Sequence, residues 1–416
     1  MSYEDARLGR TRIYVEPDGS YAVDDSANVA SNSIDFPTIE GSIQATRGDT
    51  WLDPGTMQQY KDQYEEEVLG PKSCTLSFDT ILSPPDTSLT GNGAPITETT
   101  WWTARLLKTI MGSLTAPATS GANTLVVVGS TTTTVVNVTA GHGVRFVKGT
   151  AIGCVVNGKY EYREVLSRST DLISVKVAFS AIPTAGTTIR ASYTFSMTEN
   201  PSTSLQVVHE GAEPYNRFCY RGLQGGFSLD VSTGALPKMS FSLTGAIWAK
   251  LSNTALLAAT ITNLKPSASF NNEFIVATVG STTRTVVHAV NETWTPGITY
   301  EPVKSAAGTE TVARMVRVRN NRLIQGSFNP YFDSLGLDWY ALAAANTDLA
   351  MFKQIGSATT EGGILLAAPT VQIQTPQRAQ NGNLDALSLT WKGRHDAAGV
   401  APTTDLERSA FRIHLF

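Results

Sequence analysis

One order of elements occurs twice in this sequence, and the repeat limits the folds that the chain can adopt. In each copy a strand pattern is followed by a helix pattern that opens near a tryptophan and then by two alternating strands. The first copy comprises a strand at 77–82, a helix at 97–112 and strands at 227–231 and 239–245. The second comprises a strand at 327–332, a helix at 338–356 with a break near Asn346, and strands at 371–374 and 387–393. The shared order indicates a duplicated structural unit.

The first predicted helix is amphipathic. Trp102, Leu106 and Ile110 recur every four residues, which places them on one apolar stripe. Thr97 is a suitable residue for the amino-terminal cap, and Gly112 is typical of a helix end. We therefore expect this helix to pack one face against the strands of its own copy.

The segment between helix and strand pair is much longer in the first copy, where it covers residues 114–208. It is rich in Thr and Val and contains several strand patterns, among them 144–147, and Asn157-Gly158 forms a two-residue hairpin signal. We expect a mainly β chain with a few helices and a small inserted β-barrel or sandwich module. The predicted parts are a discontinuous first domain (1–113 and 209–262), the inserted module (114–208) and a second domain (263–416).

Alternation in the repeated strands separates two faces. The apolar face, with the tryptophans and a leucine of the helices, is the predicted core: Leu76, Phe78, Trp102, Leu106, Phe227, Leu229, Phe241, Leu243, Phe328, Trp339, Ile373 and Leu389. The other face carries small, neutral or acidic side chains and no arginine: Ser77, Asp79, Ser228, Asp230, Ser240, Ser242, Ser327, Asn329, Gln372, Gln374, Ser388 and Thr390.

The charge content excludes some classes of function. Only 16% of residues are charged, against about 25% in an average soluble protein. A low charge suits a surface buried between subunits, because buried charges cost desolvation energy, and an extracellular adhesin would share this composition. The net charge is −4 and Lys and Arg are scattered, which argues against tight binding of nucleic acid.

No pattern in the sequence indicates catalysis, a cofactor or a metal site. The five histidines and three cysteines lack the spacing of metal ligands, and no nucleophile elbow or phosphate-binding loop occurs. Cys74, Cys154 and Cys219 are expected to be buried thiols in a protein made in a reducing cytosol. The amino-terminal residues lack an apolar signal core, and no long apolar run occurs. We expect a soluble protein that is not an enzyme and does not contact membranes.

Three segments resemble the tail tube (major tail) proteins of long-tailed, non-contractile bacteriophages. Residues 225–248, GGFSLDVSTGALPKMSFSLTGAIW, are similar to the hairpin in which a polar turn joins two alternating strands. Residues 8–16 and 36–49 are similar in layout to the start of the large, duplicated members of this family.

The resemblance implies β-sandwich-like barrel domains, each with a flanking helix, and six such domains in a ring. A duplicated chain would form that ring as a trimer with pseudo-sixfold symmetry, and stacked rings would form a tube that conducts DNA during ejection. The implied partners are further copies of the chain, the tape measure, tail terminator and baseplate or distal tail proteins, and transiently the phage DNA. The implied location is the virion tail, after synthesis in the cytoplasm of the bacterial host.

The polar face is predicted to line the lumen because it carries no arginine. Arginine there would pair with passing phosphates and slow the DNA. Two other functions stay open. A baseplate hub or tail-terminator protein would use the same doubled fold in a single ring. A receptor-binding or decoration protein would use the inserted module, whose role is open between outward decoration and bracing of the ring.

Overall fold

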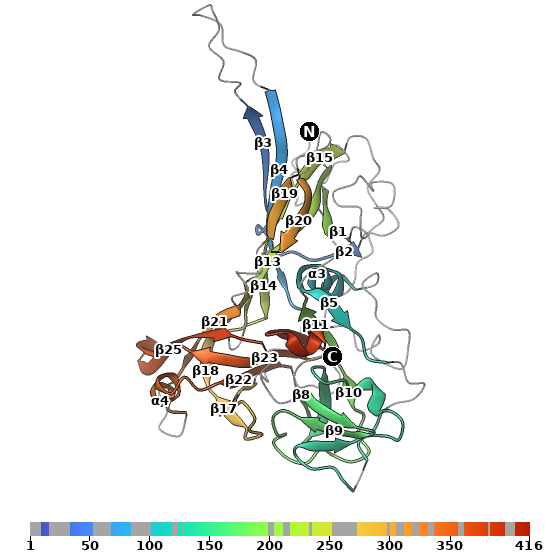
Figure 1. Ribbon diagram of the computed structural model, residues 1–416, viewed down its shortest axis with the longest axis vertical. Helices are drawn as coiled ribbons and strands as arrows, with labels where there is room; N and C mark the ends of the chain where they lie inside the picture. The colour runs from blue at the N-terminus through green and yellow to red at the C-terminus, as the bar shows by residue number, and fades with distance from the viewer. Residues whose placement is uncertain are drawn as a thin grey trace, which may run out of the picture.

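The chain folds as a mainly β protein, as predicted. Its computed structural model describes residues 10–15, 34–52, 68–84, 101–118, 124–127, 129–198, 204–210, 217–232, 235–251, 273–297, 300–304, 312–317, 324–331, 337–356, 362–381, 383–395 and 404–416. Within these ranges there are three α-helices, a large sheet whose neighbouring strands are often not consecutive in the chain, and a separate five-stranded sheet. Figure 1 shows the five-stranded sheet at the opposite end of the molecule from the projecting β3–β4 hairpin.

The strands of the large sheet come from both halves of the chain. The earlier ones are β1 (Arg10–Val15), β2 (Ile34–Asp35), β3 (Gln44–Leu52), β4 (Val68–Ile81), β5 (Gly112–Thr115), β11 (Tyr193–Met197), β12 (Leu205–Glu210), β13 (Arg217–Asp230), β14 (Lys238–Gly245) and β15 (Ile247–Leu251). The later ones are β16 (Glu273–Thr278), β17 (Thr285–Val287), β18 (Ala289–Pro296), β21 (Ile324–Pro330), β22 (Leu349–Ile355), β23 (Ile364–Ile373), β24 (Gln377–Asn381), β25 (Leu384–Gly393) and β26 (Arg412–Leu415). A two-stranded sheet pairs β19 (Tyr300–Lys304) with β20 (Val312–Arg317).

The same order of antiparallel pairing occurs in both halves. In the first, β3 pairs with β4, β4 with β14, and β14 with β13. In the second, β18 pairs with β21, β21 with β25, and β25 with β23. The two runs meet where Leu229 and Asp230 of β13 lie opposite Trp294 and Thr293 of β18. In each copy, the strand that precedes the helix (β4 or β21) therefore pairs with the second of the two repeated strands that come after the helix (β14 or β25).

The two helices differ from their predicted lengths. Helix α3 (Trp102–Met111) begins after Trp101 without a side-chain cap, while Thr97 lies outside the described residues. It ends at Gly112, whose φ of 98° is a left-handed conformation that glycine adopts without strain. Helix α4 (Trp339–Ala344) is capped by the Asp338 side chain and is much shorter than 338–356.

The second part of that predicted helix, from residue 349, is wrong. Asn346 has a φ of 52°, which breaks the helix, and the chain then forms strand β22 with all seven side chains buried. β22 pairs with β16 on one edge and β23 on the other, so its backbone hydrogen bonds are made between strands. Pairing on both edges thus overrides the local helical preference of this segment.

The small sheet has its own hydrophobic cluster. Its order is β10 (Arg190–Ala191), β7 (Ala151–Val156), β8 (Lys159–Ser169), β9 (Leu172–Val175) and β6 (Val135–Asn137). The Asn157-Gly158 hairpin is confirmed: both residues have positive φ, 50° and 76°, between β7 and β8. Strand β11 and the first four residues of β12 fall within 114–208 but pair in the large sheet, so the small sheet occupies a shorter stretch than that range.

The predicted strand at 144–147 is wrong. Residues Gly143–Arg145 form a single 3-10 turn. The Asp171 carboxylate accepts hydrogen bonds from the backbone amides of Gly141 (3.0 Å) and Gly143 (2.9 Å). These contacts curl the chain and lower the pKa of Asp171.

Candidate functional site

The candidate site is the polar face of the strands that recur in both halves. The apolar side chains predicted for the opposite face are all buried: Leu76, Phe78, Trp102, Leu106, Phe227, Leu229, Phe241, Leu243, Phe328, Trp339, Ile373 and Leu389. The polar set is half-buried or exposed throughout: Ser77, Asp79, Ser228, Asp230, Ser240, Ser242, Ser327, Asn329, Gln372, Gln374, Ser388 and Thr390. Each strand therefore presents one side to the core and one to the surface.

Strand register brings the polar residues of the first half into rows. Ser77 lies opposite Ser242, and Asp79 lies opposite Ser240, across the β4–β14 pair. Ser240 also lies opposite Ser228 on β13. Because directly opposed residues share a face of an antiparallel pair, these side chains form one continuous surface.

A second row crosses the junction between the halves. Asp230 of β13 lies opposite Thr293 of β18, Thr293 opposite Ser327 of β21, and Ser327 opposite Thr390 of β25. The Thr293 and Ser327 hydroxyls are 2.8 Å apart, and the Thr390 hydroxyl donates to Gln374 Oε1 at 2.8 Å. The polar surface is thus unbroken from one half to the other.

The register also places on this face cations that were missing from the prediction. Lys238 lies opposite Asp230, and its Nζ is 2.6 Å from Asp79 Oδ2. Burial acts to raise the pKa of Asp79, but hydrogen bonds from Lys238 and Ser240 and the Lys238 charge bring it below its ordinary value. The carboxylate therefore stays ionised and offsets the lysine charge.

Lys392 is the second such cation. It is exposed and lies opposite Gln372 across the β23–β25 pair. Both lysines could have been predicted from the sequence. Lys392 continues the alternation of Ser388 and Thr390, and Lys238 is in line with Ser240, so each shares the polar face of its strand. At the same end, Arg394 and Gln372 both bond to Asp348, the arginine at 2.6 Å, so this guanidinium is paired with a carboxylate.

A hollow of about 370 Å³ opens on the face beside the junction. Gly225 and Gly226 of β13 form part of it, with serines of β14, the end of β18 and the start of β19. A Cβ at Gly225 would lie 2.1 Å from the Ser242 backbone oxygen, so the close approach of β13 and β14 requires glycine there. Its lining is mainly neutral: Gln224, Gly225, Gly226, Phe227, Ser228, Ser240, Ser242, Thr244, Thr295, Pro296, Gly297 and Tyr300.

Aromatic packing beneath the face holds the strands in register. In the first half the Phe78 and Phe241 rings stack with centroids 5.0 Å apart. In the second half Phe328 meets Trp339 of α4 edge to face at 5.4 Å. The two halves thus support their polar strands with similar aromatic contacts and one helix each.

Glu292 of β18 and Lys353 of β22 form a buried ion pair. Lys353 Nζ is 2.5 Å from Glu292 Oε1, and both side chains are almost completely buried. Burial raises the pKa of Glu292, although the Lys353 charge acts in the opposite direction. The pair ties β18 to β22 and takes no part in the exposed face.

Nothing in the described ranges has the arrangement of a metal site, because no three His, Cys, Asp or Glu side chains gather there. The three cysteines are buried and unbridged. No helix in the described part of the chain is long and apolar enough to cross a membrane. Comparison with protein-family models and with curated proteins gives no match to this chain.

Proposed function

We propose that this protein is a structural virion protein, the tail tube subunit of a long-tailed phage. It carries two tandem tail-tube-type domains, and three copies close head to tail into a pseudo-hexameric ring. Stacked rings form the tube through which DNA leaves during ejection. The observation that carries the proposal is the repeated strand order, β3–β4–β14–β13 and β18–β21–β25–β23, joined edge to edge by β13 and β18.

The character of the joined face supports a conduit. Its hydroxyl and amide side chains bond to one another across strands, as Thr293 does with Ser327. Its cation Lys238 is offset by the Asp79 carboxylate, and Lys392 adds one exposed positive charge. Such a surface neither attracts nor strongly repels phosphates, so DNA can slide past it. This role needs no catalytic residue or cofactor.

Electron microscopy of the purified protein tests the assembly. We expect long hollow tubes with a repeat of one ring and three chains per ring. Discrete rings that never stack would favour a baseplate hub or tail terminator. Monomers that bind a cell-surface glycan would favour a receptor-binding protein, and either result would overturn the tube proposal. Binding to tape measure, terminator and distal tail proteins is expected at the tube ends.

Arginine substitutions test the conduit. Ser242→Arg and Gln374→Arg change exposed positions on the polar face, and we expect intact tubes with slowed or blocked DNA ejection. Ile182→Arg is the matched control, because Ile182 is 60% exposed on the small module. The assay is infectivity of complemented phage together with tube morphology. Normal infectivity with arginine at both face positions would refute the lumen assignment.

A further inference from the structure

The small sheet is connected by the chain to one part of the large sheet and packed against another. Its chain leaves through β5 and returns through β11. These two strands pair with each other, and β11 also pairs with β26 of the second half. Its strand β8 packs near β23, and its apolar residues share a cluster with those of the second half. In that cluster the rings of Tyr162 and Phe416 stack with centroids 4.1 Å apart. The small sheet therefore contacts a region distant from its own attachment in sequence.

One glutamine side chain fixes the orientation of β8. Gln354 of β22 is 3% exposed. Its Oε1 accepts from the Tyr162 backbone amide at 2.9 Å, and its Nε2 donates to the Tyr160 carbonyl at 2.9 Å. The amide group thus pairs with β8 as a peptide of a neighbouring strand would. Both bonds require one position of β8 along β22, because a shift of the strand would break them.

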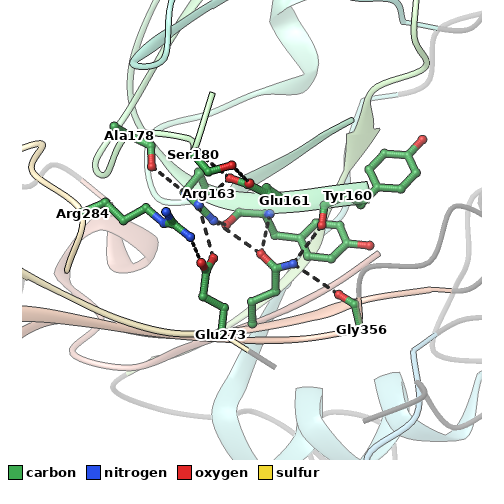
Figure 2. Close-up of polar contacts among 10 residues, drawn as sticks. Tyr160, Glu161, Arg163, Ala178, Ser180, Glu273, Arg284 and Gly356 are labelled. Atoms are coloured by element: carbon green, nitrogen blue, oxygen red, sulfur yellow. Dashed lines mark hydrogen bonds and ion pairs between the residues drawn. The ribbon is translucent and has the colours of Figure 1, made fainter. Parts of the chain in front are cut away.

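An arginine of β8 crosses the same contact. Arg163 bonds to Glu161 at 2.7 Å and reaches Glu273 of β16 at 3.5 Å, and Arg284 also pairs with Glu273 (Figure 2). Burial lowers the pKa of Arg163 to about 10, and the Glu161 charge counteracts this shift. The guanidinium is charged at neutral pH and is held by carboxylates from both sides of the contact.

A second buried ion pair lies farther along β8. Glu164 of β8 pairs with Arg412 of β26, and Lys176 lies 3.3 Å from the other Glu164 oxygen. The Glu164 and Arg412 side chains are fully buried. Arg412 also donates to the backbone oxygen of Leu406 at 2.8 Å, so its guanidinium is fixed on its own side. Directional contacts of this kind select one geometry, whereas apolar contact alone would permit sliding.

We propose that the small sheet is a rigid strut, clamped onto the second half of the chain by Gln354 and by the Arg163 and Glu164 ion pairs. The two halves of the large sheet pair directly at β13–β18, over two residue pairs, and at β11–β26, over four. The strut adds side-chain contacts from β8 to β16, β22 and β26 beside these strand pairs. Together these contacts fix the orientation of the small sheet against the second half.

Spin-label distances within one chain test the strut without relying on the proposed tube. Ile182 and Leu384 are 60% and 58% exposed, and the native cysteines are buried, so Ile182→Cys and Leu384→Cys accept labels selectively. Labelled chains are diluted in unlabelled protein, which makes the distance intramolecular. We expect a single narrow distance distribution, and a broad one would overturn the proposal.

The clamp itself is tested in the same labelled chain. Gln354→Ala combined with Arg163→Met should broaden the distribution, while Gln380→Ala, at an exposed glutamine of β24, should leave it unchanged. A distribution that stays narrow in the double variant would show that these contacts do not fix the small sheet. If the double variant fails to fold, Gln354→Asn alone gives the comparison, because its shorter amide cannot reach both backbone partners.

Discussion

Replacing Gln354 by alanine is expected to destabilise the whole protein measurably. The substitution removes two buried hydrogen bonds, one to the Tyr162 amide and one to the Tyr160 carbonyl. A buried backbone group that loses its partner costs about 1–3 kcal/mol. Two such groups would cost about 2–6 kcal/mol, and water that enters the space left by the side chain would offset part of this. We therefore expect a loss of about 2–4 kcal/mol in the free energy of unfolding.

Urea denaturation followed by tryptophan fluorescence measures this loss. With a slope of about 3 kcal/mol per molar urea, the midpoint should fall by about 1 M. Gln380→Ala removes the same side chain from an exposed position of β24 and should change the free energy by less than about 0.5 kcal/mol. If Gln354→Ala behaved like this control, the two hydrogen bonds would contribute nothing to stability and the reasoning would be refuted.

Three further outcomes follow from buried groups. Glu164→Gln leaves the Arg412 guanidinium without its buried carboxylate and should cost about 3–5 kcal/mol in urea denaturation; a loss under 1 kcal/mol would contradict this. Gly326→Ala places a Cβ 2.5 Å from the Trp391 ring and nearer still to the backbone of β18, so circular dichroism should show a lower melting temperature, and an unchanged one would count against the close packing. Burial, with the nearby positive charges, holds the pKa of His414 well below its ordinary value. The unfolded chain therefore binds the proton first, and stability should fall as the pH drops below about 6.5; His414→Gln should flatten this dependence in denaturation curves at several pH values.

The alternating strands were predictable from sequence because one face of each is buried. The pair Phe227 and Phe241, directly opposite across β13 and β14, follows from period-two alternation and a turn of polar residues. The mainly β class followed from the same signal. The segment after Asn346 was misassigned because β22 is buried on both faces, so its sequence carries no alternation and resembles a helix as much as a strand.

The contact between the small sheet and the second half left no recognisable signal in the sequence. In β8, Glu161 and Arg163 alternate with Tyr160 and Tyr162, the pattern of a strand with one charged face and one aromatic face, and Glu164 follows as a further charge. In the structure most of this stretch is buried, because the charged side chains meet partners from β16 and β26. A charge that is neutralised by a residue more than a hundred positions away cannot be told from a solvated charge by local pattern.

The strut and the polar face use different parts of the large sheet, so the two proposals make separable demands on the molecule. The small sheet contacts residues of β16, β22, β23 and β26, whereas the polar face lies on the strands around the β13–β18 junction. A side chain such as Ser242 therefore remains exposed while the strut is docked. Arginine on the face should impair DNA passage without changing the distance between labels. Loss of the clamp should change that distance and leave the chemistry of the face intact.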